Sequence, residues 1–130
     1  MSYDEFLSQV IEQGIEGARC SYGSGEPHYQ KKLKGSIDGF EACRGRSPDE
    51  ILELLGQARR KTHEAMARSH AGEITNDDYW EVRCREAEIE WTANVVSAML
   101  VNQGRKPIVP PTVRGAMQAA LILGAKGRTS

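Results

Sequence analysis

The sequence lacks a surplus of charge of either sign, and it lacks a long apolar run. Its 17 lysine and arginine residues balance 18 aspartate and glutamate residues, and the formal net charge is −1 at pH 7. This balance argues against the broad positive field of a protein that binds long nucleic acid, but it suits a small anionic ligand. The longest apolar run, near Val95–Val101, contains Ser97 and falls short of the ~20 residues of a membrane-spanning helix. We therefore expect a soluble protein that contacts neither long nucleic acid nor a membrane.

Cysteine is scarce, and no two cysteines form a C-x-x-C pair. Cys20, Cys43 and Cys84 make an odd number in a chain without a signal peptide, which is typical of reduced thiols in a cytoplasm. We expect a cytoplasmic protein in which all three side chains are buried as small apolar groups. The glycine-rich stretch SYGSGEP, residues 21–27, follows no strand and lacks the G-x-x-x-x-G-K-[ST] pattern, so it predicts a loop and no cofactor.

No segment alternates apolar and polar residues as a half-buried strand does, and no internal repeat is present. Apolar residues recur instead at helical spacing between capping signals, in a length of 130 residues that suits one domain. The sequence therefore predicts an all-α fold: a single helical domain over residues 1–130, with about five helices packed as a bundle. The helices are expected from a Ser2 cap to near Tyr22, from beyond Pro27 to about Cys43, from a Ser47 cap to His70–Gly72, from Thr75 to a cap at Gly104, and from beyond Pro111 through Leu123.

Two of these helices have unusual faces. The second contains Gly35 and Gly39 four residues apart, so one face has almost no side chain and lets another backbone or a ligand approach closely. The fourth is the longest, and its later half is apolar on several sides, which predicts burial between neighbouring helices or between subunits. We therefore expect a homodimer or a higher homo-oligomer.

Polar residues interrupt the apolar half of the fourth helix. Glu90, Asn94 and Ser97 lie at positions i, i+4 and i+7, and so share one face. A buried amide or carboxylate without a hydrogen bond costs about 1 to 3 kcal/mol, so each must meet a polar partner. Two interpretations stay open: a network that bridges neighbouring helices, or the wall of a ligand pocket.

The start of the fifth helix, VPPTVRG at residues 109–115, predicts an anion site. The first backbone N–H groups of a helix lack internal partners and carry the positive end of its dipole. Thr112 is a good N-cap, and Arg114 extends its donors from the first turn toward whatever the N–H groups of Thr112 and Val113 hold. The alternative is a well-capped helix with a surface arginine.

A second stretch, CRGRSP at residues 43–48, has the same design. Arg44 and Arg46 flank Gly45 directly before the Ser47 cap, so two such sites together can hold a pyrophosphate. Loop arginines are also common in solvent. A nucleotide base needs a flat ring to stack on, and the available rings are Tyr22, Tyr29, Trp80 and Trp91, of which Trp91 is better explained as core.

Signs of catalysis are few. His28, His63 and His70 have no metal-ligand spacing with a third ligand, so we expect them at the surface. The pairs Glu50/Glu53 and Glu86/Glu90 resemble the carboxylates with which all-α nucleotide pyrophosphohydrolases hold magnesium. One turn after Glu90, however, Asn94 stands where an aspartate is usual. We therefore expect no enzyme and no metal, and keep a magnesium-dependent nucleoside triphosphate pyrophosphohydrolase as the alternative.

Three stretches carry a resemblance to a known family: GFEACRG at residues 39–45, EIEWTANVVSAML at 88–100 and PPTVRGAMQAA at 110–120. With its size and helical layout, the chain resembles the phage anti-Thoeris sponge proteins, which sequester the cyclic ADP-ribose signal of bacterial TIR enzymes. The resemblance implies binding without turnover in the host bacterial cytoplasm, an oligomer, and in some members a second site for cyclic oligonucleotides.

The resemblance and the physical reasoning agree best on Arg114, with the N–H groups of the Thr112–Val113 turn, and on Asn94. The resemblance further implies that Arg44 is a second phosphate contact and that Glu90 accepts hydrogen bonds from ribose hydroxyls or orients an arginine. The main hypothesis is thus a small cyclic nucleotide held by Arg114, Thr112, Val113, Asn94, Glu90 and Arg44. A structural or adaptor protein without a small ligand is a third possibility.

Overall fold

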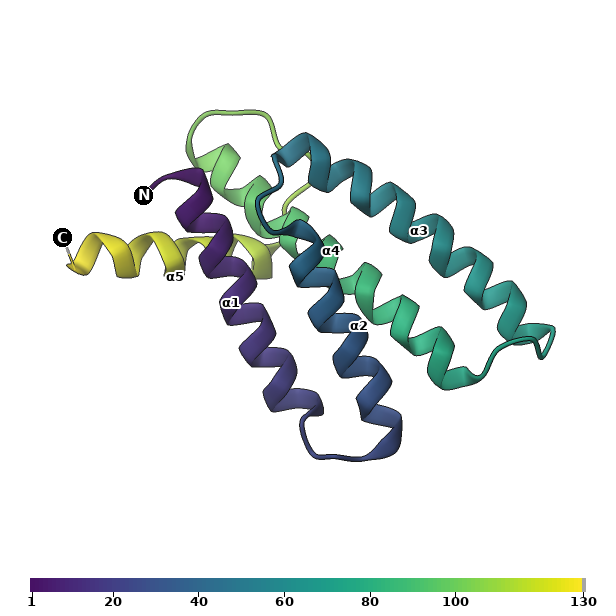
Figure 1. Cartoon of the computed structure of the whole chain (residues 1–130). Coiled ribbons are helices and arrows are strands. Elements are labelled where there is room, and N and C mark those ends of the chain that lie inside the picture. The colour runs from purple at the N-terminus through teal and green to yellow at the C-terminus, as the bar shows by residue number, and fades with distance from the viewer. Residues whose placement is uncertain (130) are drawn as a thin grey trace.

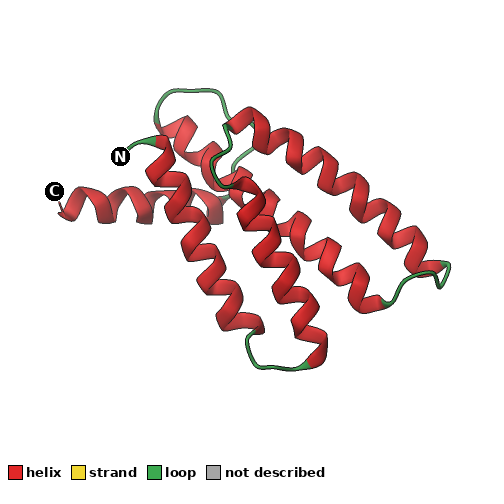
Figure 2. Cartoon of the chain, in the orientation of Figure 1, coloured by secondary structure: helices red, strands yellow, loops and turns green. Residues whose placement is uncertain are grey.

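A computed structural model describes the backbone of residues 1–129 and the side chains of residues 1–124. The described chain is all-helical and contains no strand, which confirms the predicted fold class (Figures 1 and 2). Its fifth helix continues beyond the predicted end at Leu123. The five helices are α1 (Tyr3–Tyr22), α2 (Pro27–Cys43), α3 (Pro48–His70), α4 (Asn76–Asn102) and α5 (Val113–Thr129).

Local capping explains where the helices begin. The Ser2 hydroxyl accepts a hydrogen bond from the Glu5 amide at 3.1 Å, as the sequence predicted. Ser47 forms a reciprocal capping box with Glu50 at the start of α3, and α4 begins with a similar box from its Thr75 cap. Each of these bonds depends on residues three positions apart, so these starts are encoded locally.

Helix α4 lies at the centre of the fold and packs against the other four helices. Every residue from Thr92 to Leu100 is buried, and the core residues of α1, α2, α3 and α5 surround them. The later half of α4 is therefore apolar on several sides because helices of the same chain cover it. Burial between subunits is not needed to explain its composition.

The two glycines of α2 allow α2 and α4 to meet backbone to backbone. A Cβ atom at Gly35 would overlap the carbonyl oxygen of Glu81, and one at Gly39 would lie 2.6 Å from the carbonyl oxygen of Arg85. The predicted close approach is confirmed, and the group that approaches is a helix backbone. Ion pairs join the same helices, with Lys31 Nζ 3.2 Å from Asp78 and Lys34 Nζ 3.6 Å from Glu81.

One burial prediction was wrong: Cys20 is exposed, although Cys43 and Cys84 are buried. On α3, Met66 is 41% exposed, and the buried face of that helix includes Thr62. The Thr62 hydroxyl donates to the Ala58 carbonyl at 3.0 Å, so its polar atom is satisfied inside the helix.

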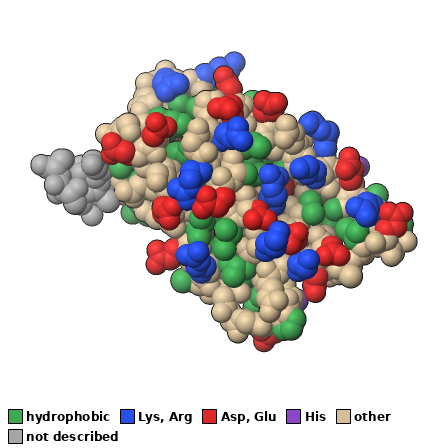
Figure 3. Space-filling view, in the orientation of Figure 1, with side chains coloured by type: hydrophobic (Ala, Val, Ile, Leu, Met, Phe, Trp, Pro, Cys, Tyr) green, Lys and Arg blue, Asp and Glu red, His purple; other side chains and the backbone are tan. Residues whose placement is uncertain are grey.

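Positive and negative side chains are interspersed on the face shown in Figure 3, with no continuous basic patch on that face. Among the described residues, no helix combines the length and apolarity that crossing a membrane requires. The three histidines are exposed, as predicted.

Candidate functional site

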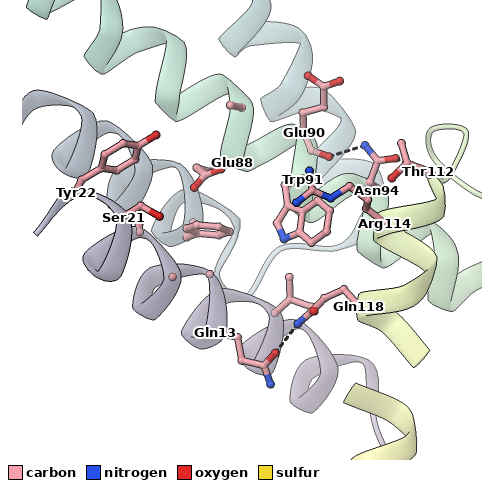
Figure 4. Close-up of a pocket in the computed structure, with 16 residues that line it drawn as sticks. Gln13, Ser21, Tyr22, Glu88, Glu90, Trp91, Asn94, Thr112, Arg114 and Gln118 are labelled. Carbon is pink, nitrogen blue, oxygen red and sulfur yellow. Dashed lines mark hydrogen bonds between the residues drawn. The ribbon is translucent and has the colours of Figure 1, made fainter. Parts of the chain in front are cut away.

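A cleft of about 630 Å³ opens between α1, the middle of α4 and the first turns of α5 (Figure 4). This volume lies within the range of small-molecule sites. One wall is α1 between Val10 and Tyr22, another is α4 between Ala87 and Asn94, and Phe40 of α2 contributes its ring. Residues far apart in the sequence therefore form one cavity.

Four of the six predicted site residues line this cleft. Glu90 and Asn94 come from α4, and Thr112 and Arg114 come from the start of α5. Figure 4 shows Arg114 and Asn94 close together at one end, with Trp91 beside them. Asn94 and Arg114, which are twenty positions apart in the sequence, were both predicted as site residues and lie at the same end of this cleft.

Asn94 holds the start of α5 in place. Its side-chain oxygen accepts a hydrogen bond from the Thr112 amide at 3.1 Å, and its side-chain nitrogen donates to the Glu90 carbonyl at 3.0 Å. One turn further along α4, the Ser97 hydroxyl accepts from the amides of Ile108 and Val109. The network interpretation of this polar face is therefore correct for Ser97, whereas Asn94 belongs both to the network and to the cleft wall.

The N-terminus of α5 retains free donors. The Thr112 hydroxyl accepts from the Gly115 amide at 3.0 Å, which confirms the predicted cap. Within the described residues, the amides of Val113 and Arg114 donate to no acceptor. Nor does the Arg114 guanidinium pair with any described carboxylate. Arg114, with an unpaired guanidinium and a free amide, therefore lines one end of the cleft beside the Thr112 cap.

Three aromatic rings line the cleft, those of Tyr22, Phe40 and Trp91. Trp91 was expected in the core; it packs against the core but is only partly buried, and the rest of it faces the cavity. Tyr22 lies at the other end, 5.6 Å from the ring of Tyr29 between centroids. Trp80 packs elsewhere, under the ammonium group of Lys32 at 4.8 Å.

The α1 wall was not predicted. Gly17 has no atom within 4 Å of where a Cβ would lie, so it leaves a bare strip of helix beside the cavity. At the α5 side, Gln118 donates to Gln13 at 2.5 Å and closes one edge of the cleft. Both features depend on how α1 and α5 are oriented, which has no signal in the sequence.

Glu88 lines the cleft, and the pKa of its carboxyl is shifted far from its usual value. It was not identified as a site residue from the sequence. It points from α4 into the end of the cavity near Tyr22 and Ser21 (Figure 4). Burial raises the pKa of its carboxyl to about 7, and the nearby Ser36 hydroxyl only partly offsets this. Its spacing was a usable signal, because Glu88, Trp91 and Asn94 lie at i, i+3 and i+6 on one side of α4.

Two predicted residues lie outside the cleft. The Arg44 guanidinium contacts Glu12 at 2.6 Å and Glu41 at 2.7 Å, so it is neutralised on the surface between α1 and α2. Val113 is 78% exposed and does not line the cleft. The CRGRSP stretch borders a different cavity, so the two predicted anion sites do not form one pyrophosphate site.

The carboxylates of the hydrolase alternative do not converge. Glu50 caps α3, Glu86 lies 3.5 Å from Arg83, and Glu90 lines the cleft. Among the described side chains, no group of three or more His, Cys, Asp and Glu residues is arranged to hold a metal ion.

The chain was compared with protein-family models, with curated proteins and with solved structures, and none of the three comparisons found a match.

Proposed function

We propose that this chain is a binding protein that captures a small anionic nucleotide in the cleft between α1, α4 and α5 and holds it without cleaving it. One observation carries the proposal: Arg114, whose guanidinium and amide have no partner among the described residues, lines a cavity of about 630 Å³ at the start of α5. Helix N-termini and arginine are the groups that proteins use to bind phosphate.

The rest of the cleft suits the remainder of a nucleotide. Trp91 offers a ring face on which a base stacks, and the Gln13–Gln118 pair offers acceptors and donors for ribose hydroxyls, whereas the Glu90 carboxylate points away from Trp91 (Figure 4). The described lining contains no histidine, cysteine or lysine, and the proposal assigns its other glutamate, Glu88, to a contact with the ligand.

The resemblance to anti-Thoeris proteins narrows the ligand class. Under this proposal the chain is a phage sponge in the cytoplasm of a bacterial host, and its ligand is a cyclic ADP-ribose signal. Such a ligand has a pyrophosphate for the α5 end of the cleft and a purine for Trp91. Arg44, which is paired with Glu12 and Glu41, has no part in this site.

Self-association is part of the proposal, with a second copy of the chain on α5. Val113, Met117 and Leu121 are 78%, 61% and 67% exposed and lie at i, i+4 and i+8, so they form one apolar ridge. Beside it, Ala116, Ala120 and Gly124 form a row of small residues into which the same ridge of a second copy packs. The ridge exposes roughly 300 Å² of apolar side chain, enough for the apolar centre of a dimer interface that buries ~800 Å² per partner.

The proposal is tested by recovery of the bound molecule. The protein is incubated with each cyclic ADP-ribose isomer, freed of unbound ligand and denatured, and the released compound is identified by its mass. We expect intact ligand in amounts that match the protein. Release of a hydrolysed product would contradict the proposal, and magnesium-dependent release of pyrophosphate from nucleoside triphosphates would favour the hydrolase in its place.

A further inference from the structure

We infer that Glu88 is the specificity-determining residue of the cleft, and that it recognises the amino edge of an adenine-type base at the end opposite Arg114. This inference rests on the proposed function, because it names the part of the ligand that lies away from the phosphate. The Glu88 carboxyl is not needed to hold the fold together or to bind the phosphate, and the inference gives it a role in recognising the base.

The geometry of α4 places Glu88 at the correct distance from the anion site. Glu88, Trp91 and Asn94 face the cleft at three-residue intervals, so Glu88 lies about 9 Å along the helix axis from the residue that holds the α5 N-terminus. Trp91 lies between them. A nucleoside monophosphate with its phosphate at Arg114 and its base on Trp91 extends over this length and brings the base edge to Glu88.

The surroundings of Glu88 contain no positive partner. Among the described residues it forms no ion pair with a lysine, arginine or histidine. The groups that face it are the Ser36 hydroxyl from α2, Tyr22 from α1 and Cys84 from its own helix. Burial raises the pKa of both Tyr22 and Cys84, so neither supplies charge at neutral pH. The cleft therefore leaves a half-buried carboxyl that has the Ser36 hydroxyl beside it but no positive partner until a ligand binds.

A carboxyl group that titrates near pH 7 pairs with adenine in either of two forms. The protonated form donates to N1 of a neutral adenine and accepts from its 6-amino group. The ionised form suits an adenine that carries a substituent on N1 and is therefore cationic. It accepts a hydrogen bond from the 6-amino group of that base. The two bases thus require opposite protonation states of Glu88.

This opposition gives a direct test with two probes, AMP and 1-methyladenosine 5′-monophosphate. Both carry the same phosphate, so the ratio of their dissociation constants cancels the titration of the phosphate. In the parent protein, we expect the dissociation constant of the methylated probe, divided by that of AMP, to fall by at least about fivefold between pH 6 and pH 8. In Glu88→Gln the ratio is expected to stay constant. Glu86→Gln, which changes a carboxyl on the same helix outside the cleft, is expected to keep the parent's pH dependence.

The outcomes separate the two proposals. If both probes bind and binding needs Arg114, but the ratio is independent of pH or is unchanged in Glu88→Gln, the inference on Glu88 is wrong and the proposed function stands. If neither probe binds the parent protein at any pH, the inference on Glu88 is overturned, and the recovery of cyclic ADP-ribose decides the proposed function separately. Equal far-ultraviolet circular dichroism of the parent and Glu88→Gln shows that loss of the pH dependence does not come from unfolding.

Discussion

The two sides of α4 differ in whether their charged groups lie near a partner of opposite charge. On the side of α2 and α3, backbones meet at Gly35 and Gly39, and Lys31 and Lys34 pair with carboxylates of α2 and α4. On the side of α1 and α5, the described residues leave Arg114 and Glu88 without a partner of opposite charge beside a cavity. The first side is closed by the chain itself, and the second is open to a ligand.

Under the proposed function, this difference separates the side of α4 that sets stability from the side that binds the ligand. A closed interface gains from every well-placed group, whereas an unpaired buried group lowers stability unless a partner binds to it. Local departures from good packing and pairing are expected at functional sites. The comparison therefore predicts that changes on the α2 side alter folding, and that changes on the α1–α5 side alter binding.

The largest effect is expected from Gly35→Ala, on the closed side. The new Cβ atom would overlap the Glu81 carbonyl oxygen, which belongs to a helix backbone and cannot turn aside. We expect a loss of about 3 kcal/mol or more in the free energy of unfolding, despite the higher helix propensity of alanine. Urea unfolding measures this loss.

Gly56→Ala is the matched control in α3. Its Cβ would lie 3.8 Å from the nearest atom, Nη1 of Arg60, so we expect a gain of up to about 1 kcal/mol. If the two variants had the same stability, α2 and α4 would not meet as closely as described.

The next effect concerns the open side and depends on pH. The pKa of Glu88 is about 7 in the folded chain, above its usual value of 4.5, so folding favours its protonated form. The free energy of unfolding should therefore fall as the pH rises from about 4.5 through 7, by at most about 3 kcal/mol. Glu88→Gln cannot ionise, so it should match the parent near pH 4 and exceed its stability at pH 8.

Urea unfolding across this pH range, without ligand, measures the effect. A Glu88→Gln variant that is less stable than the parent at pH 8 would show that the carboxylate stabilises the fold, and the contrast between the two sides of α4 would then be lost.

A smaller effect is expected on the apolar ridge of α5. Met117→Glu places a charge in the centre of the proposed contact between two copies, and should weaken self-association by at least about tenfold. Leu52→Glu changes a 41% exposed leucine of α3, away from α5, and should leave self-association unchanged. Sedimentation velocity over a range of protein concentrations measures self-association in the parent and in both variants. A parent protein that stays monomeric throughout would remove the oligomer from the proposal.

The parts of this structure that the sequence predicted are those set by neighbouring residues. The caps at Ser47 and Thr112 depend on bonds to residues three positions away, and both were expected. The pairing of Arg44 with Glu41, three positions away, was open to the same local reasoning and was missed, whereas its pairing with Glu12 joins two helices and has no local signal. Glu88 escaped notice for a similar reason: its burial depends on how α1 and α2 pack over α4, which spacing along one helix does not determine.

The central claim is that Arg114 and the start of α5 bind the phosphate of a nucleotide. Calorimetric titration of cyclic ADP-ribose into the parent and into Arg114→Ala tests it most directly, with Arg59→Ala, an exposed arginine of α3, as the control. Arg114→Ala loses a charge-assisted contact worth about 1.5 to 3 kcal/mol, so we expect it to bind roughly ten- to a hundredfold more weakly. Arg114→Lys should recover part of this affinity, because a lysine cannot reproduce the two-donor fork. The melting temperature of the ligand-free protein should stay unchanged. Equal affinity in the parent and in Arg114→Ala would contradict the claim and leave the start of α5 as a capped helix with a surface arginine.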